Sequence, residues 1–290
     1  MAAQSTGAYY VPHGSAWPIL GSVALFFLLG GAASLVNEDH TFGMIKFAIG
    51  LTLLLVMLFG WFGTVIKESV GGMYNDQVDI SFRMGMVWFI FSEVMFFAAF
   101  FGALFYARIF AVPWLGGEGD GFATNALLHP GFEAVWPTNG PNAMGGPFET
   151  IPAWGLPLLN TLLLLTSGLT ITMAHWALKV GKRTALNVWM ALTIALGGLF
   201  LYFQGVEYVH AYQELGLTLG SGVYGSTFFM LTGFHGMHVT LGTIMLLVIL
   251  FRCMAGHFTK DNHFAFEAVA WYWHFVDVVW LGLFVFVYVV

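Results

Sequence analysis

The sequence has 290 residues, of which 59% are hydrophobic and 8% charged, whereas a soluble domain has about 45–50% apolar and about 25% charged residues. This composition excludes a water-soluble monomer, because too few polar side chains remain to face water. The 9 Lys and Arg against 15 Asp and Glu give a net charge of −6, which does not favour a nucleic-acid-binding protein. The single cysteine, Cys253, excludes an intrachain disulfide and a cysteine-rich metal site.

Seven apolar runs are each long enough to cross a bilayer, which takes about 20 residues of helix. They cover residues 17–36, 42–66, 84–107, 154–178, 188–211, 223–251 and 268–290. Pro18 and Pro157 fall in the first turns of two of these runs, where a missing N–H costs nothing. We therefore expect an all-α polytopic membrane protein with seven transmembrane helices, forming a single membrane domain over residues 1–290.

The basic residues indicate the orientation of these helices. Seven of the nine lie at the second, fourth and sixth connections: Lys67, Arg83, Lys179, Lys182, Arg183, Arg252 and Lys260. Because Lys and Arg stay preferentially on the cytoplasmic side, the N-terminus is expected inside and the C-terminus outside. The expected location is the inner (cytoplasmic) membrane of a bacterium, with the mitochondrial inner membrane as the alternative.

The third connection, residues 109–153, is the long one and is rich in Gly, Pro and Asn. It is too polar to span a membrane and falls on the outer side. Connections of this length serve as covers, as contacts with partners, or are partly disordered. We favour contact with another subunit.

Glu93 is an ionisable residue within the third run. It follows Arg83 by ten positions, so at a rise of about 1.5 Å per residue it lies roughly 15 Å from the inner end of its helix. A bare carboxylate at this depth is strongly disfavoured, so Glu93 is expected to carry a proton or to meet a hydrogen-bond donor on a neighbouring helix. A role in proton chemistry and a purely structural hydrogen bond both remain open.

Three pairs of polar residues have i, i+3 spacing, which places both members on one helix face. They are Glu207/His210, His235/His238 and His274/Asp277. A di-iron bundle requires two Glu-x-x-His motifs, and this sequence has one. We therefore expect no metal ligand and an interhelical polar network made of Glu207, His210, His235, His274 and Asp277.

Cationic and indole donors gather where the inner headgroup region is expected. Arg252 and His257 end the sixth run, on the side that also receives Lys67 and Trp61. Such donors suit a phospholipid phosphate. An ordinary positive-inside anchor is the alternative.

Several stretches together resemble subunit III of cytochrome c oxidase, the haem-copper terminal oxidase subunit 3 family. They are YVPHGSAWP at 10–18, FSEVMFF at 91–97, PLLNT at 157–161, GVYGSTFF at 222–229, GFHGMHV at 233–239, HFAFEA at 263–268 and AWYWHFVDVVW at 270–280. Their order and spacing extend over nearly the full chain.

The resemblance implies an accessory subunit of a proton-pumping oxidase of aerobic respiration, a translocase of the respiratory electron-transport chain. It implies two helices set apart from five by a lipid-binding cleft, with subunits I and II and membrane phospholipids as partners. The chain would stabilise subunit I and support proton uptake without a catalytic residue or redox centre of its own. Haem and copper are then expected in the partner subunits, and the chain itself would bind phospholipid.

The resemblance also implies roles for particular residues. Family lipid contacts fall on Trp61, Glu68, His238, Arg252 and His257, and the family's buried, carbodiimide-reactive carboxylate falls on Glu93. The sequence departs from the family at residues 71–76, GGMYND, where a His-rich turn is usual, and at Phe62, where many members have tryptophan. A different headgroup donor near the second connection would follow.

Three alternatives remain at this point. The first is subunit III of a quinol-oxidising haem-copper oxidase, which belongs to the same family. The second is an independent intramembrane metalloprotein with the ligands Glu207, His210, His235, His238 and His274. The third is a proton-coupled carrier centred on Glu93.

Overall fold

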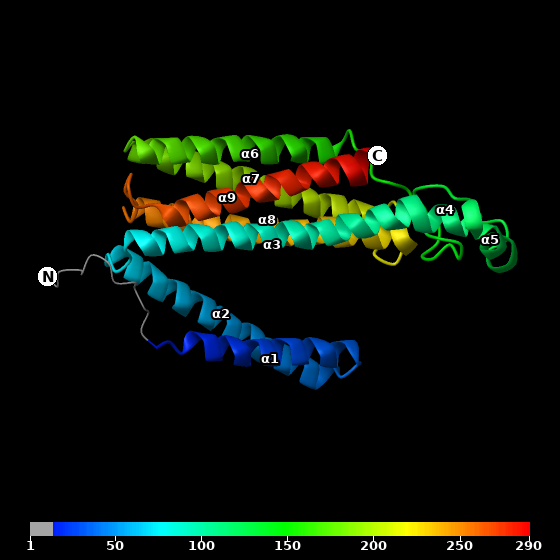
Figure 1. Cartoon of the computed structure of the whole chain (residues 1–290), viewed down its shortest axis with the longest axis horizontal. Coiled ribbons are helices and arrows are strands. Elements are labelled where there is room, and N and C mark those ends of the chain that lie inside the picture. Colours follow the sequence, from blue (N-terminus) through cyan, green and yellow to red (C-terminus); the bar gives the residue numbers. More distant parts are fainter. Residues whose placement is uncertain (1–13) are drawn as a thin grey trace. The chain divides into compact units, whose positions relative to one another are not determined.

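The computed structural model describes residues 14–290, so residues 10–13 of the N-terminal family stretch lie outside the described part. Within residues 14–290 the secondary structure is helical and includes no strand (Figure 1). Seven helices are long and apolar enough to cross a membrane. The expected all-α polytopic membrane protein with seven such helices is therefore confirmed.

The long helices are α1 (Trp17–Val36), α2 (His40–Val70), α3 (Asp76–Tyr106), α6 (Leu156–Lys179), α7 (Arg183–Gln213), α8 (Gly222–Met254) and α9 (Phe264–Leu283). Short elements lie between α3 and α6: a π-helical turn (Ala107–Ala111), α4 (Val112–Leu115), a 3₁₀ turn (Gly119–Gly121) and α5 (Phe122–Leu128). A π-helical segment (Phe284–Val289) continues α9.

Several helices extend beyond their apolar runs, and α3 does so at its start. It begins at Asp76, well before the expected residue 84, because acidic residues in a first helical turn favour helix formation. An ion pair of 2.7 Å between Arg83 Nε and Asp79 Oδ2 supports this polar turn. At the other end the chain stays helical to Leu115, so the segment expected as a loop from residue 109 begins as helix.

In the rest of the third connection, a side chain bonds to backbone groups of the same connection. The side-chain amide of Asn125 donates to the carbonyl groups of Leu115, His129 and Phe132 at 3.0, 3.2 and 3.1 Å. These bonds join the end of α4 to the turn that follows α5. The connection is therefore an ordered segment in which polar backbone groups are satisfied locally.

The chain forms two compact units, one ending at Met84 and the other covering residues 85–290. In the first unit, α1 and α2 approach at backbone distance. A Cβ atom on Gly50 would lie 2.3 Å from the Leu28 nitrogen, and one on Gly31 would lie 2.4 Å from the Phe47 nitrogen. Glycine at these two positions permits the close contact, as is typical of helix pairs in lipid.

In the second unit, α9 packs against α6 and α8, and α6 and α8 each pack against α7 (Figure 1). Two fully buried indoles of α9, Trp273 and Trp280, fill this interior. Their ring N–H groups donate to Ser167 and Thr161 of α6, each at 2.9 Å. Each indole thus occupies apolar space and satisfies its single donor, as buried tryptophan requires.

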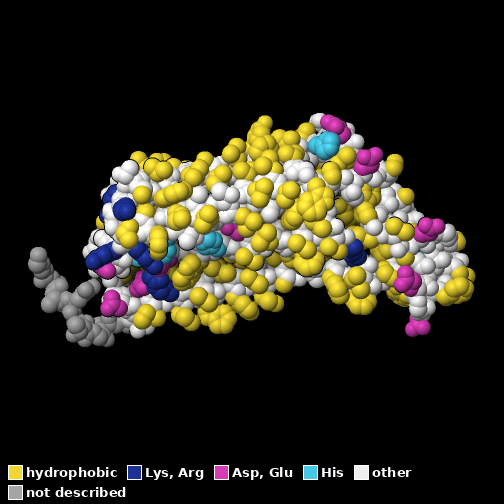
Figure 2. Space-filling view, turned by 90° about the horizontal axis from the view of Figure 1, so that it is seen from above, with side chains coloured by type: hydrophobic (Ala, Val, Ile, Leu, Met, Phe, Trp, Pro, Cys, Tyr) yellow, Lys and Arg dark blue, Asp and Glu magenta, His cyan; other side chains and the backbone are white. Residues whose placement is uncertain are grey.

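Figure 2 shows hydrophobic side chains over most of the visible face. In the second unit, the turn between α6 and α7 contains Lys179, Lys182 and Arg183. Large apolar side chains such as Trp176 and Phe251 are exposed on the long helices. Such a surface suits contact with lipid or other apolar helices.

The packing around Trp273 predicts different effects for two adjacent glycines of α7. A Cβ atom on Gly197 would lie 2.7 Å from the Trp273 ring, whereas a Cβ atom on Gly198 would meet open space. We expect Gly197→Ala to lower the free energy of unfolding by about 1–3 kcal/mol relative to Gly198→Ala, since overpacking displaces the ring. Thermal unfolding in detergent measures this, and equal melting temperatures would contradict the packing described.

Candidate functional site

A polar contact joins Glu93 of α3 to His238 of α8 in the second unit. The Oε2 atom of Glu93 lies 3.0 Å from Nε2 of His238. The Glu93 side chain is 22% exposed and that of His238 is 7% exposed. The structure therefore gives Glu93 a partner on a neighbouring helix, which is one of the two states expected from the sequence.

The second ring nitrogen of His238 shows that this contact contains a proton. Nδ1 lies 2.6 Å from the carbonyl oxygen of Phe234, which can only accept, so Nδ1 is the donor. In a neutral ring Nε2 then has a lone pair and cannot donate to Glu93. A hydrogen bond at 3.0 Å thus requires either a protonated Glu93 or an imidazolium at His238, so the pair holds one proton between its two facing atoms.

Aromatic rings surround this pair. The imidazole of His238 lies 5.0 Å from the ring of Phe97 and stacks on that of Tyr272 at 6.3 Å, centroid to centroid. Phe96 and Phe100 of α3 pack against Phe234 of α8, at 5.0 and 5.1 Å. The contact between Glu93 and His238 therefore lies in an apolar setting, where a polar group without a partner is costly.

Glu207 lies in the last part of α7 and is 1% exposed. Its Oε1 atom accepts from Gln204 Nε2 at 3.1 Å and from the Tyr288 hydroxyl at 2.5 Å. Tyr288 belongs to the π-helical segment after α9. Glu207 therefore connects α7 to the C-terminal helix through a hydrogen bond.

His235 of α8 is 1% exposed, and its Nε2 donates to the Val276 carbonyl of α9 at 3.2 Å. His274 of α9 lies beside Thr172 of α6, Nε2 to Oγ1, at 3.3 Å. Its Nδ1 is 3.8 Å from Oδ2 of Asp277. These groups join α9 to α8 and to α6, each through a separate partner.

His210 lies apart from these groups. Its Nδ1 is 3.1 Å from Oε2 of Glu214, one turn further on, and both side chains are exposed. The five residues of the expected network therefore contact different partners. The ligand set of the metalloprotein alternative, Glu207, His210, His235, His238 and His274, is not brought together, since among residues 14–290 the group of three candidate ligands that converges is a different one.

The residues expected to contact lipid fall in both units. In the first, Trp61 is exposed, and Glu68 Oε2 accepts from the Tyr74 hydroxyl at 2.7 Å. In the second, Arg252 is buried with its guanidinium over the Phe258 ring at 4.5 Å, and His257 is exposed. Tyr74 lies within the segment that departs from the family, and there it supplies a polar partner for Glu68.

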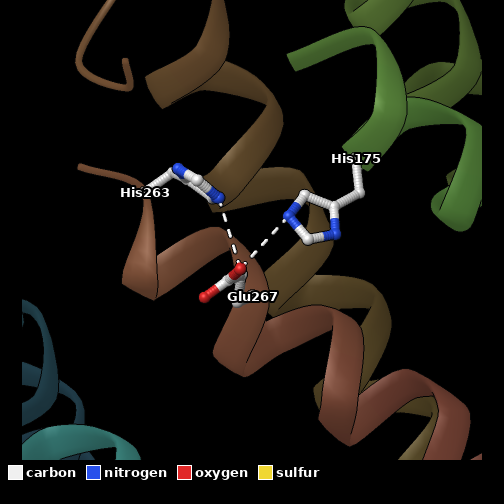
Figure 3. A group of neighbouring side chains, drawn as sticks. All are labelled: His175, His263 and Glu267. Carbon is white, nitrogen blue, oxygen red and sulfur yellow. Dashed lines mark ion pairs between the residues drawn. The ribbon is translucent and has the colours of Figure 1, made fainter. Parts of the chain in front are cut away.

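The sequence analysis missed the converging group, which consists of His175, His263 and Glu267 (Figure 3). His175 lies near the end of α6, whereas His263 immediately precedes α9 and Glu267 lies in its first turn. The four-residue spacing of His263 and Glu267 was the available signal. His175 could be added to them only once the helices were placed.

Known proteins resemble this sequence over nearly its full length. The family profile described as Cytochrome c oxidase subunit III matches residues 7–290. Proteins named Cytochrome c oxidase subunit 3 from Oncorhynchus masou and Latimeria chalumnae are 40% and 41% identical over 287 residues, covering 99% of this chain and 98% of each relative. The protein of that name from Prototheca wickerhamii is 38% identical over 281 residues, covering 97% of this chain and 96% of the relative.

The proton shared by Glu93 and His238 predicts a contrast between two substitutions. In Glu93→Gln the amide N–H can donate to Nε2, so we expect the free energy of unfolding to stay within about 0.5 kcal/mol. In Glu93→Ala the buried Nε2 loses its partner, which costs about 1–3 kcal/mol. Unfolding in detergent measures both variants.

Glu214→Ala at the exposed His210 pair is the control, with an expected change in the free energy of unfolding below about 1 kcal/mol. Equal losses in both Glu93 variants would refute the shared proton.

Proposed function

This chain belongs to the cytochrome c oxidase subunit III family, and from that membership we propose that it is an accessory subunit of a proton-pumping cytochrome c oxidase. It is a membrane protein and part of an oxidoreductase complex with other oxidase subunits. The proposal adds that its partners are subunits I and II, that haem and copper reside there, and that this chain supplies no catalytic residue. The observation that carries it is the family match over residues 7–290.

The use of the buried polar groups supports an accessory role. Glu93, Glu207 and His235 each contact a neighbouring helix, as do the indoles of Trp273 and Trp280. Ionisable groups in membrane helices are energetically costly, so each is expected to serve the structure or the function of the protein. Here these groups attach α3, α6, α7 and α8 to one another and to α9.

The accessory role has a physical basis in covering subunit I. A flank of subunit I that faced lipid directly would place polar groups of its proton-uptake route against hydrocarbon, which penalises them. A rigid helical cover with ordered phospholipid keeps these groups hydrated and fixed in place. The exposed apolar faces of the long helices, with residues such as Leu165 and Leu169, suit such a contact.

Phospholipid binding is the second part of the proposal. Trp61 and Glu68 supply contacts in the first unit, and His238, Arg252 and His257 supply them in the second. At headgroup depth, the indole of Trp61, the guanidinium of Arg252 and the imidazole of His257 attract phosphate. Because Nε2 of His238 faces Glu93, a lipid at that position would meet the partly exposed carboxyl group of Glu93 beside it.

We further propose that the two units form one membrane domain, with the N-terminus inside and the C-terminus outside. The membrane is the one in which the oxidase operates, a bacterial cytoplasmic membrane or a mitochondrial inner membrane. The segregation of Lys and Arg supports this orientation. The name that the cited relatives share supports cytochrome c over quinol as the electron donor of the complex.

Removing this chain from the complex tests its proposed role. We expect the oxidase without it to start at a comparable rate and then to lose activity during turnover several-fold faster, because subunit I loses its cover. The measurement is oxygen consumption over successive turnovers, with haem content as the control for intact subunits I and II. An unchanged inactivation rate would contradict the accessory role.

A further inference from the structure

Three potential metal ligands meet where the end of α6 lies against the beginning of α9. His175 is contributed by α6, His263 immediately precedes α9, and Glu267 lies in the first turn of α9 (Figure 3). Their ligand atoms all lie within 4.8 Å of one another. This group takes no part in the contacts described for Glu93, Glu207 or His235.

Both imidazoles face the same carboxylate oxygen. Nε2 of His175 and Nε2 of His263 each lie 3.3 Å from Oε1 of Glu267 (Figure 3). Both nitrogen atoms are buried, and neither has a hydrogen-bond partner of suitable geometry within the described residues. Buried polar atoms are normally satisfied, so these two nitrogens need an explanation.

The hydrogen bond of the other ring nitrogen of His263 determines whether Nε2 of the neutral ring is a donor or an acceptor. Nδ1 lies 3.0 Å from the Thr259 carbonyl oxygen, which only accepts, so Nδ1 is the donor. In the neutral ring Nε2 then directs a lone pair at the carboxylate, and two acceptors repel each other. A proton on His263 or on Glu267, or a metal cation between the atoms, removes this repulsion.

The two nitrogen–oxygen distances match those around a tetrahedral metal ion. Zn²⁺ binds histidine nitrogen and carboxylate oxygen at about 2.0–2.2 Å, so two ligand atoms of a tetrahedron are about 3.3–3.6 Å apart. Both measured nitrogen–oxygen separations are 3.3 Å. The bond from Nδ1 of His263 to a backbone carbonyl is also the usual outer contact of a metal-binding histidine.

We propose that His175, His263 and Glu267 bind one divalent transition-metal ion, with Zn²⁺ as the ion best suited to two histidines and one carboxylate. The fourth position is left for water, and the 23% exposed side chain of His175 marks the side from which an ion enters. The bound ion links the end of α6 to the start of α9. This proposal departs from the expectation that the chain binds no metal, and it does not depend on the proposed function.

Zinc content tests the site directly. The full chain is purified in detergent with the subunits that accompany it, incubated with Zn²⁺, desalted and analysed for zinc per chain. We expect His175→Gln, His263→Gln and Glu267→Gln each to retain one equivalent less than the unchanged protein. His210→Gln removes an exposed histidine that pairs with Glu214 alone, and this matched control should retain the full amount.

A measurement on the unchanged chain avoids the question of whether a variant folds. Co²⁺ bound by two nitrogens and one oxygen in a four-coordinate site gives visible absorption far more intense than that of the octahedral ion in water. We expect this absorption to appear on adding Co²⁺ and to disappear when Zn²⁺ displaces it. Equal zinc contents in all the proteins, or no intense cobalt absorption, would overturn the proposal and leave a proton shared by His263 and Glu267 as the explanation of their contact.

Discussion

Helices in a bilayer cannot leave polar groups to water, so each such group must find its partner within the protein. In the second unit this constraint is met mainly through α9. Trp273 and Trp280 donate to hydroxyl groups of α6, the Val276 carbonyl accepts from His235 of α8, and Tyr288 donates to Glu207 of α7. These contacts determine which faces of the surrounding helices turn inward. Small residues such as Gly197 and Gly242 then admit the Trp273 ring between α7 and α8.

The same constraint explains why the fold could be predicted in outline. Apolar runs of bilayer length can only be helices, so seven of them sufficed to predict seven spanning helices. The runs did not show where the helices end, because polar turns such as the one at Asp76 continue a helix without apolar residues. The early part of the third connection was misjudged for another reason, because residues 109–115 are apolar and continue the helix past Arg108 to Leu115. Specific stretches such as HFAFEA at 263–268 indicated the family, which the periodicity of apolar residues could not indicate.

The site was less predictable, because spacing indicates a shared helix face and not a shared partner. His235 and His238 are one turn apart, yet the first contacts α9 and the second contacts Glu93 of α3. His210 has the same spacing from Glu207 but lies exposed beside Glu214. Burial of Glu93 correctly predicted a partner on another helix, although nothing in the sequence selected His238. His175 could not be grouped with His263 and Glu267 because their helices are distant along the chain.

In the proposed accessory role the chain acts through the rigidity of its helices, and that rigidity depends on the bonds made by α9. A double-mutant cycle on Trp273→Phe and Ser167→Ala measures one such bond most directly, from the free energies of unfolding of both single variants and the double variant. We predict a coupling energy of about 0.5–2 kcal/mol, in the range of hydrogen bonds between membrane helices. Strictly additive effects would contradict the account, because the contact between the indole and the hydroxyl group would then contribute nothing to holding α6 and α9 together.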